Sequence, residues 1–181
     1  MDSVPVICEG WAASTLMLSN GRRQILSFLL PGEMITAGLL FERQLHCTVI
    51  SITRCCYRNF DRSQLRDAMF HSEKIFDRIL RTYNVEKRKS DQLITDLGQR
   101  TASERVARLI LDIWGRSEKL GMVKDDRIEF PLRQSQIADA TGLTNVYASK
   151  ILGDLRKNGL IDISGRSLQI IDMTKLRRLA Q

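Results

Sequence analysis

The chain has 181 residues, of which 43% are hydrophobic and 27% charged, a composition typical of a globular protein with a buried core. No apolar run reaches the ~18 residues of a membrane span, and the N-terminus lacks a secretory signal pattern, so we expect a cytoplasmic protein. The net charge is +7, of which residues 1–98 carry +2 and residues 99–181 carry +5. This asymmetry favours a polyanionic partner for the C-terminal half.

Short segments rich in β-branched or apolar residues fill the first sixty positions and predict strands. They are Val4–Cys8, Ala13–Leu18, Gln24–Leu29 and Cys47–Thr53. Asn20-Gly21 predicts a hairpin, because both residue types tolerate positive φ, and Pro31-Gly32 predicts a second turn. Leu39–Glu42 is expected to form a short helix. The pattern as a whole predicts an antiparallel sheet or roll.

A long segment without proline or glycine follows from Arg62 and ends at Gly98. Apolar or small residues recur in it at spacings of three, four and their multiples, which predicts one helix from about Ser72 to Leu97 with a narrow stripe. Such a stripe is typical of a two-stranded coiled coil. The expected dimer seam consists of Ile75, Ile79, Thr82, Glu86, Leu93 and Leu97. The alternative is that the stripe packs on the helix's own domain.

Gly98 is expected to end this helix, and Thr101-Ala-Ser-Glu104 has the form of a capping box that begins a new one. The buried face of the new helix is expected to contain Val106, Leu109, Ile110 and Ile113. These signals predict three regions: a strand-rich domain over 1–70, a dimerisation helix over 71–98, and a third domain over 99–181.

Residues 134–153, QSQIADATGLTNVYASKILG, satisfy the demands of a helix-turn-helix. The small Ala138 lies where two helices cross closely, Gly142 provides positive φ in the turn, and Thr144 is a natural N-cap for the second helix. The core between the helices is expected to consist of Ile137, Leu143, Ala148 and Ile151. The register of these features predicts a module that inserts its second helix into the major groove of DNA.

The predicted recognition helix runs from about Asn145 to Lys157. Residues expected to read base edges are Asn145, Val146, Ser149 and Lys150. Residues expected to contact phosphates are Arg133, Thr144, Tyr147, Arg156 and Arg166. Arg166 lies in the turn of a predicted wing whose strands are Leu160–Ile163 and Ser167–Ile171, with Arg127–Leu132 as a third strand.

The stretches TDLGQRTASERVARLILDIW and FPLRQSQIADATGLTNVYASKILGDLRKNGLI, with the wing, resemble the Crp/Fnr family of dimeric transcription regulators. EGWA, LSNGRRQILSFLLPGEMI and HCTVISIT resemble the end of that family's β-roll. The resemblance implies an α+β fold: a partial cyclic-nucleotide-binding-type antiparallel β-roll, a long dimerisation helix and a C-terminal winged helix-turn-helix. It also implies a homodimer on palindromic promoter sites, with double-stranded DNA and RNA polymerase as partners and no membrane.

Three departures from the family pattern matter. The chain starts inside the roll, so we expect either an internal or alternative start or a shortened protein, with unpaired strand edges. The Thr36–Gly38 stretch stands where cAMP-binding members carry a Glu, and His46-Cys47 stands where they carry Arg-Ser or Arg-Thr. Without that arginine no cation pairs with the cyclic phosphate, so we expect no cAMP. Val146 replaces an acidic residue of the recognition helix, which predicts a different target sequence.

The four cysteines form no CxxC pair and do not reproduce the family's iron–sulfur cluster; they are Cys8, Cys47, Cys55 and Cys56. We therefore expect no metal and no cofactor, and a redox role for a cysteine stays open.

No P-loop, GxSxG or HExxH motif is present, so we expect that the protein is not an enzyme. The alternative to a sequence-specific regulator is a small-molecule-sensing or interaction module with a vestigial DNA-binding domain, which would bind its ligand without preferring any DNA sequence.

Overall fold

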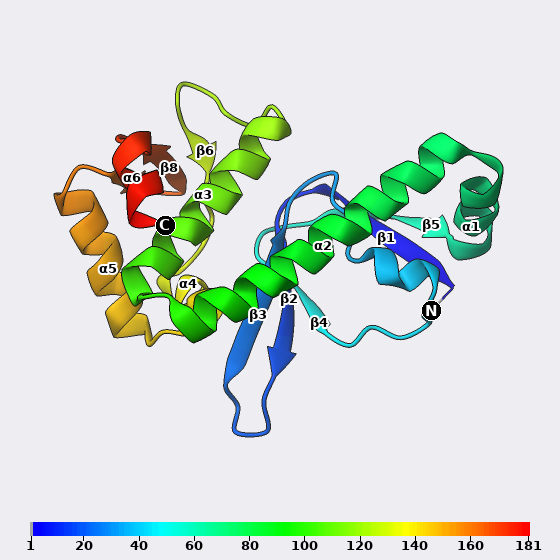
Figure 1. Ribbon diagram of the computed structural model, residues 1–181, viewed down its shortest axis with the longest axis horizontal. Helices are drawn as coiled ribbons and strands as arrows, with labels where there is room; N and C mark the ends of the chain where they lie inside the picture. Colours follow the sequence, from blue (N-terminus) through cyan, green and yellow to red (C-terminus); the bar gives the residue numbers. More distant parts are fainter. Residues whose placement is uncertain (1) are drawn as a thin grey trace. The chain divides into compact units, whose positions relative to one another are not determined.

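The computed structural model describes residues 2–181, which form two units, one ending at Leu93 and the other comprising Ile94–Gln181. The helix α2 (Glu73–Gln99) contains the boundary between them (Figure 1). Across these residues, none of the helices has the length and apolar character needed to cross a bilayer. Each unit combines antiparallel strands with helices, as the predicted α+β class requires.

Two antiparallel sheets make up the strands of the first unit. β1 (Ser3–Glu9) pairs with β5 (Cys56–Asp61), while β2 (Ala12–Met17) lies between β3 (Arg23–Leu29) and β4 (Thr48–Ser51). The four predicted strands are confirmed within a few residues. β5 was not predicted, because all six of its residues are exposed and its sequence, CYRNFD, therefore shows no alternation of apolar and polar side chains.

The predicted hairpin connects β2 and β3 and projects from its unit (Figure 1). Gly21 adopts a φ of 79°, as the turn requires, and its N–H donates to the carbonyl of Leu18 at 2.9 Å. Asn20 contributes differently from the expectation, because it is not one of the positive-φ residues. Its side-chain oxygen instead accepts from the Arg22 N–H at 3.0 Å and closes the turn.

Three helical segments cover the first unit: η1 (Ala37–Leu40), α1 (Arg62–His71) and the first part of α2. Ser72, with an extended φ of −142°, separates α1 from α2, and this short first helix was not predicted. The residues buried together beneath these helices are Val4, Leu39, Leu40, Met69 and Ile79. The apolar side chains of one strand, two helices and η1 thus form one core cluster.

Glu86 of α2 binds the N-terminus of η1. Its carboxylate accepts from the Thr36 hydroxyl at 2.9 Å and from the Ala37 N–H at 2.9 Å. Burial raises the pKa of Glu86 above its usual 4.5, although these two hydrogen bonds and the nearby Lys89 act in the opposite direction. The contact adds a polar link between α2 and the sheet domain to the apolar packing of Ile79.

This placement corrects two positions of the predicted dimer seam. Ile79 is only 8% exposed and packs with Val4 in the core of its own unit, and Glu86 is bound to η1, so both are engaged within the chain. Of the other predicted positions, Thr82 and Leu93 are half-buried, and Ile75 and Leu97 are exposed. Successive helical residues point about 100° apart, so most of the predicted stripe faces inward and an adjacent stripe faces solvent.

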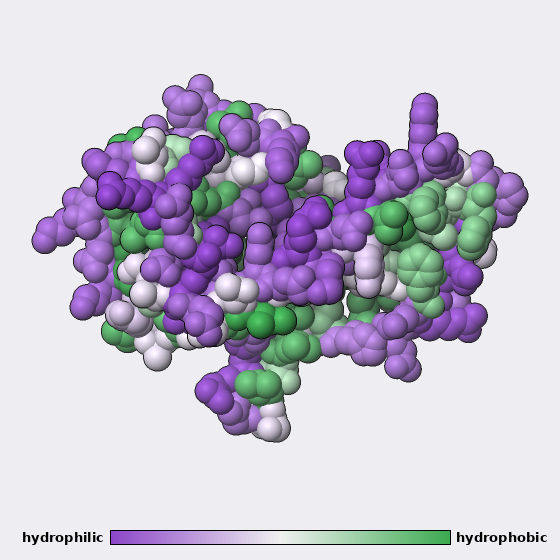
Figure 2. All heavy atoms as spheres, in the orientation of Figure 1, coloured by the Kyte–Doolittle hydropathy of each residue, from purple (hydrophilic) through white to green (hydrophobic). Residues whose placement is uncertain are grey.

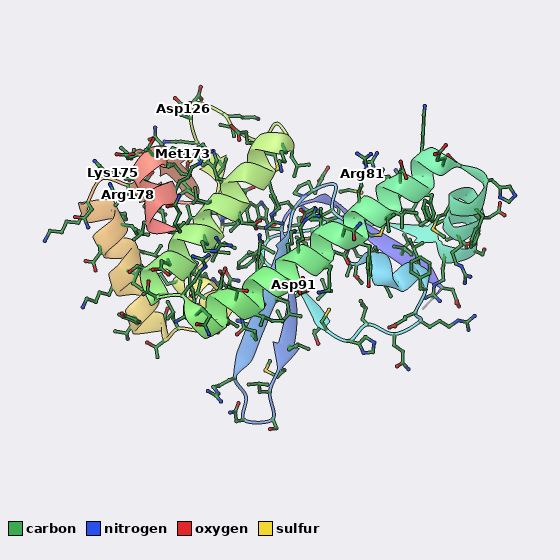
Figure 3. All side chains as sticks on the ribbon, in the orientation of Figure 1. Arg81, Asp91, Asp126, Met173, Lys175 and Arg178 are labelled. Atoms are coloured by element: carbon green, nitrogen blue, oxygen red, sulfur yellow. The ribbon has the colours of Figure 1, made fainter. Side chains whose placement is uncertain are left out.

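The solvent-facing stripe of α2, here called the outer stripe, begins at Phe76 and continues at spacings of four and three. It consists of Phe76, Leu80, Tyr83, Lys87, Ser90 and Ile94, and all of them are exposed. Figure 2 shows apolar surface gathered where α1 and the start of α2 lie. Arg81, by contrast, projects into solvent from a different side of the helix (Figure 3). A stripe with this spacing is the pattern that a second helix covers in a coiled coil.

The second unit packs three helices and a small sheet around α3 (Ala102–Lys119). The predicted capping box is confirmed, since the Thr101 N–H donates to Glu104 at 3.1 Å and the Glu104 N–H donates to the Thr101 hydroxyl at 3.4 Å. The sheet, of order β6-β8-β7, comprises β6 (Ile128–Glu129), β7 (Ile161–Ser164) and β8 (Ser167–Ile170). The remaining helices are α4 (Gln134–Thr141), α5 (Asn145–Lys157) and α6 (Met173–Leu179).

The pKa of Glu86, which burial raises, predicts a pH-dependent stability. Because the folded-state pKa of Glu86 is raised, the folded chain binds this proton more tightly than the unfolded chain does. The free energy of unfolding should therefore fall as the pH rises from about 4.5 through the folded-state pKa. Glu86→Gln keeps the side-chain shape but cannot ionise, so its stability relative to the native chain should increase over this range. Urea denaturation at a series of pH values measures the difference.

Glu86→Ala serves as the control in the same experiment. It removes the acceptor for Thr36 and Ala37 altogether and should cost about 1–3 kcal/mol of unfolding free energy. If native and Glu86→Gln chains gave parallel curves of stability against pH, the buried carboxylate would not titrate as described.

Candidate nucleic-acid interface

The predicted helix-turn-helix is present and closely packed. α4 and α5 are joined by three residues, in which Gly142 has a φ of 65°. The Leu143 N–H donates to the carbonyl of Ala138 at 3.0 Å, which ends the first helix. Of the predicted core residues, Ile137, Ala148 and Ile151 are buried, whereas Leu143 is half-buried. The sequence therefore determined both helices and the turn between them.

No residue other than glycine fits comfortably at position 142. A Cβ atom built there would lie 2.8 Å from Leu97 Cδ2 and 3.3 Å from Arg105 Nη1. The left-handed conformation would add strain to this close approach. The turn thus brings the start of α5 against the end of α2 and the first part of α3, within the second unit.

The exposed face of α5 carries most of the residues predicted to read bases. Asn145, Val146 and Lys150 are exposed, Val146 to 81%, whereas Ser149 is half-buried. Within residues 2–181, no side-chain hydrogen bond or ion pair is formed by Asn145 or Lys150. One helix face therefore presents an amide, a methyl-bearing group and an ammonium group to an incoming ligand, which is the chemistry that base edges require.

The predicted phosphate contacts are exposed, but two of them already have partners. Thr144 is the N-cap of α5, and its hydroxyl accepts from the Tyr147 N–H at 3.3 Å. Arg166, in the turn of the wing, lies 3.4 Å from a carboxylate oxygen of Glu129 in an exposed ion pair. Arg133 and Arg156 are exposed. An exposed ion pair contributes little energy, so Arg166 can exchange Glu129 for a phosphate at low cost.

Additional polar residues extend the interface beyond the predicted set. Gln134 and Ser135, at the start of α4, are exposed beside Arg133, and Lys157 is exposed seven residues after Lys150 on α5. Seven residues are nearly two helical turns, so Lys157 lies on the same side of α5 as Lys150. This spacing in the sequence could have identified Lys157 as part of the candidate interface. The α4 residues had no comparable signal, because their exposure depends on how α4 packs against α3.

Arg127 holds the wing in place. Its guanidinium donates to Asp162 at 2.7 Å, to Gln169 at 3.1 Å and to Ser164 at 3.1 Å. The hydrogen bond from Arg127 is the main reason why the pKa of Asp162 lies below its ordinary value. Both wing strands are thereby tied to the residue that precedes β6, and the turn that contains Arg166 is held at a defined position. Lys175 and Arg178 add basic groups on α6 (Figure 3).

Known proteins share both parts of this arrangement. The profile of the Crp-like helix-turn-helix domain matches residues 104–179, and that of the cyclic nucleotide-binding domain matches residues 1–72. The chain is 27% identical over 183 residues to the transcriptional activator protein FnrL of Cereibacter sphaeroides, covering 97% of this chain and 72% of FnrL. The chain belongs to the Crp/Fnr family of transcription regulators.

Further relatives support the assignment of this chain to the Crp/Fnr family. The nitrogen fixation regulation protein FixK of Bradyrhizobium diazoefficiens is 27% identical over 176 residues, covering 96% of this chain and 72% of FixK. The solved structure of FixK2 from Bradyrhizobium japonicum matches with a TM-score of 0.88 and 27% identity, covering 99% of this chain and 88% of that one. These relatives are transcription regulators rather than enzymes, and the chain is accordingly a DNA-binding transcription regulator.

The residues of this Crp/Fnr regulator do not fit a cyclic phosphate at the position where cAMP-binding members hold one. The Thr36 hydroxyl and the Ala37 N–H, which could donate to an anion, both donate to Glu86. His46 Nε2 lies 2.9 Å from a carboxylate oxygen of Glu42, and no arginine stands beside it in the sequence pair His46-Cys47. A phosphate here would meet carboxylates instead of a guanidinium.

Gly142→Ala should lower the free energy of unfolding by about 1–3 kcal/mol, because the new methyl group collides with Leu97 and the left-handed backbone is strained. Gly153→Ala is the matched control, since a Cβ at this α5 position meets no atom within 4 Å. It should raise stability by about 0.5–1 kcal/mol through helix propensity. Thermal and urea denaturation of both variants measure the contrast, and changes of the same sign would contradict the packing described.

Proposed function

We propose that this regulator reads palindromic promoter sites as a homodimer, with α5 of each subunit in the major groove. The observation that carries the proposal is the exposed face of α5, where Asn145, Val146 and Lys150 lie together. Asn suits adenine, Lys suits guanine, and the Val methyl groups suit the thymine methyl. Ser149, which is half-buried on the same helix, is the fourth proposed base-reading residue.

Phosphate contacts are proposed to fix the position of α5 in the groove. The residues proposed for them are Arg133, Thr144, Tyr147, Arg156 and Arg166. They flank α5 on the loop before α4, on α5 itself and on the wing, so they would contact phosphates on both sides of the groove. Each neutralised phosphate releases counterions, and binding should therefore weaken steeply with rising salt.

The outer stripe of α2 is the proposed dimer contact. Its apolar members Phe76, Leu80 and Tyr83 are exposed, although large apolar side chains at heptad spacing are usually covered. A second copy of α2 supplies an identical stripe, and a two-fold axis between them would match a palindromic site. The inward-facing Ile79 and Glu86 would then connect the dimer helix to the sheet domain rather than to the partner.

The proposed setting is the bacterial cytoplasm, where promoter DNA lies and where the relatives named as transcriptional activators would act. A regulator of this type changes transcription by contacting or obstructing RNA polymerase, so we propose the polymerase as a further partner. The proposed regions are a sensor domain over 1–70, a dimerisation helix over 71–98 and a DNA-binding domain over 99–181.

Lys150→Ala should weaken binding to the preferred site by about 1–3 kcal/mol, or roughly 5- to 150-fold, and should hardly affect binding to random DNA. The preferred site is first selected from random duplexes, and affinities are then measured by fluorescence anisotropy on that site and on a scrambled duplex. Arg156→Ala is the control, because loss of a phosphate contact should weaken both duplexes alike. Equal losses of affinity for Lys150→Ala on both duplexes would mean that Lys150 contacts only phosphate. If the protein bound a small molecule saturably but preferred no DNA sequence, the alternative of a vestigial DNA-binding domain would be favoured.

Leu80→Glu should convert the dimer into monomers, because it places a charge in the outer stripe at a position that is 44% exposed in the single chain. Val85→Glu is the matched control. Val85 is similarly exposed, at 40%, but lies on the opposite side of α2. Sedimentation velocity should show monomers for the first variant and dimers for the second. An intact dimer of Leu80→Glu would reject the outer stripe as the contact.

A further inference from the structure

Cys8 and Cys56 lie across from each other on β1 and β5. Ile7 pairs with Tyr57 and Glu9 pairs with Cys56, and the register shifts between Ile7 and Glu9. Cys8 is the extra residue of a β-bulge, in which two residues of one strand oppose a single residue of the other. Cys8 and Glu9 therefore both face Cys56 across the ladder.

Both thiols are exposed. Ile7 is buried in the core, so the next side chain, Cys8, points outward, and it is exposed. Cys55, the residue before β5, packs against that core, and its thiol donates to the Trp11 carbonyl at 2.9 Å. Cys56, the first residue of β5, is exposed.

The spacing of neighbouring residues across an antiparallel ladder suits a disulfide. Opposed residues in an antiparallel pair have Cα atoms about 4.5–5.5 Å apart, and disulfides span Cα separations of about 4.4–6.8 Å. The strand ends are also held together, since a Cβ at Gly10 would lie only 2.1 Å from the Arg54 carbonyl oxygen. Trp11 N–H donates to the Thr53 hydroxyl at 2.9 Å in the same place. Cys8 and Cys56 are therefore neighbours at a closely held end of the ladder.

We propose that Cys8 and Cys56 are a redox-active pair that forms a reversible disulfide with a small-molecule disulfide, such as oxidised glutathione, as the oxidant. One protein thiolate attacks the small disulfide, forms a mixed disulfide and releases one small thiol. The second protein thiolate then attacks the protein sulfur of the mixed disulfide and releases the second small thiol. Two electrons and two protons pass from the cysteine pair to the two released thiols, and reduced dithiols reverse the exchange.

The other two cysteines differ from this pair. Cys47 is half-buried, and burial raises the pKa of its thiol, which lowers its reactive thiolate fraction. Cys55 is half-buried and hydrogen-bonded to Trp11. Cys47 and Cys55 are therefore controls that the proposal leaves outside the exchange.

The test uses the full chain with Cys47→Ser and Cys55→Ser combined, so that only the proposed pair remains. At micromolar protein, equilibration with reduced and oxidised glutathione at graded ratios should remove both free thiols together in one step. Non-reducing peptide mapping after trypsin should join residues 1–22 to residues 55–58, and dithiothreitol should separate them. Removal of Cys55 makes the second attachment point unambiguous.

Cys8→Ser and Cys56→Ser in the same background should abolish the joined peptides and leave a single glutathione adduct. The oxidised pair should raise the midpoint of thermal unfolding by several degrees, because the bond closes a long loop, whereas neither single variant should show this shift. Separate glutathione adducts on both cysteines without a link, or a link only between two chains, would overturn the proposal.

Discussion

The proposed DNA-reading surface depends on one tight turn. Gly142 allows α4 and α5 to cross closely, because its left-handed backbone places no side-chain atom where Leu97 and Arg105 already lie. The position of α5 then follows from the buried Ala148 and Ile151, which lock one face of the helix and leave the opposite face exposed. Thr144 caps the helix at the point where the chain leaves the turn. Recognition chemistry is therefore a consequence of packing on the hidden side of α5.

Glu86 has a comparable role in the first unit. A buried carboxylate is costly unless hydrogen bonds compensate for lost water, and the Thr36 hydroxyl and Ala37 N–H provide them. The same contact occupies the Thr36 hydroxyl and the Ala37 N–H, so neither group is available to an anionic ligand. Glu86 thus adds to the apolar packing of Ile79 in attaching α2 to the sheet domain.

The elements that could be predicted from the sequence are those whose signals are local. The capping box at Thr101 and Glu104 and the turn glycine Gly142 each depend on residues within a few positions, and the structure confirms both. β5 was not predicted, because it is exposed on both faces and its sequence therefore shows no alternation of apolar and polar residues. α1 escaped because its boundary with α2 is a single extended residue, Ser72, which carries no strong breaking signal.

The sequence by itself determined that this chain has a winged helix-turn-helix, a long helix and a strand-rich N-terminal part, and it identified the exposed residues of α5. Only the tertiary structure decided which stripe of α2 faces inward, because stripes one residue apart have nearly the same composition and differ only in what they touch. It also decided that Cys8 lies beside the residue that pairs with Cys56, since a bulge shifts the register by one residue and leaves no mark in the sequence. Periodicity specifies that a face exists, whereas long-range contacts specify its partner.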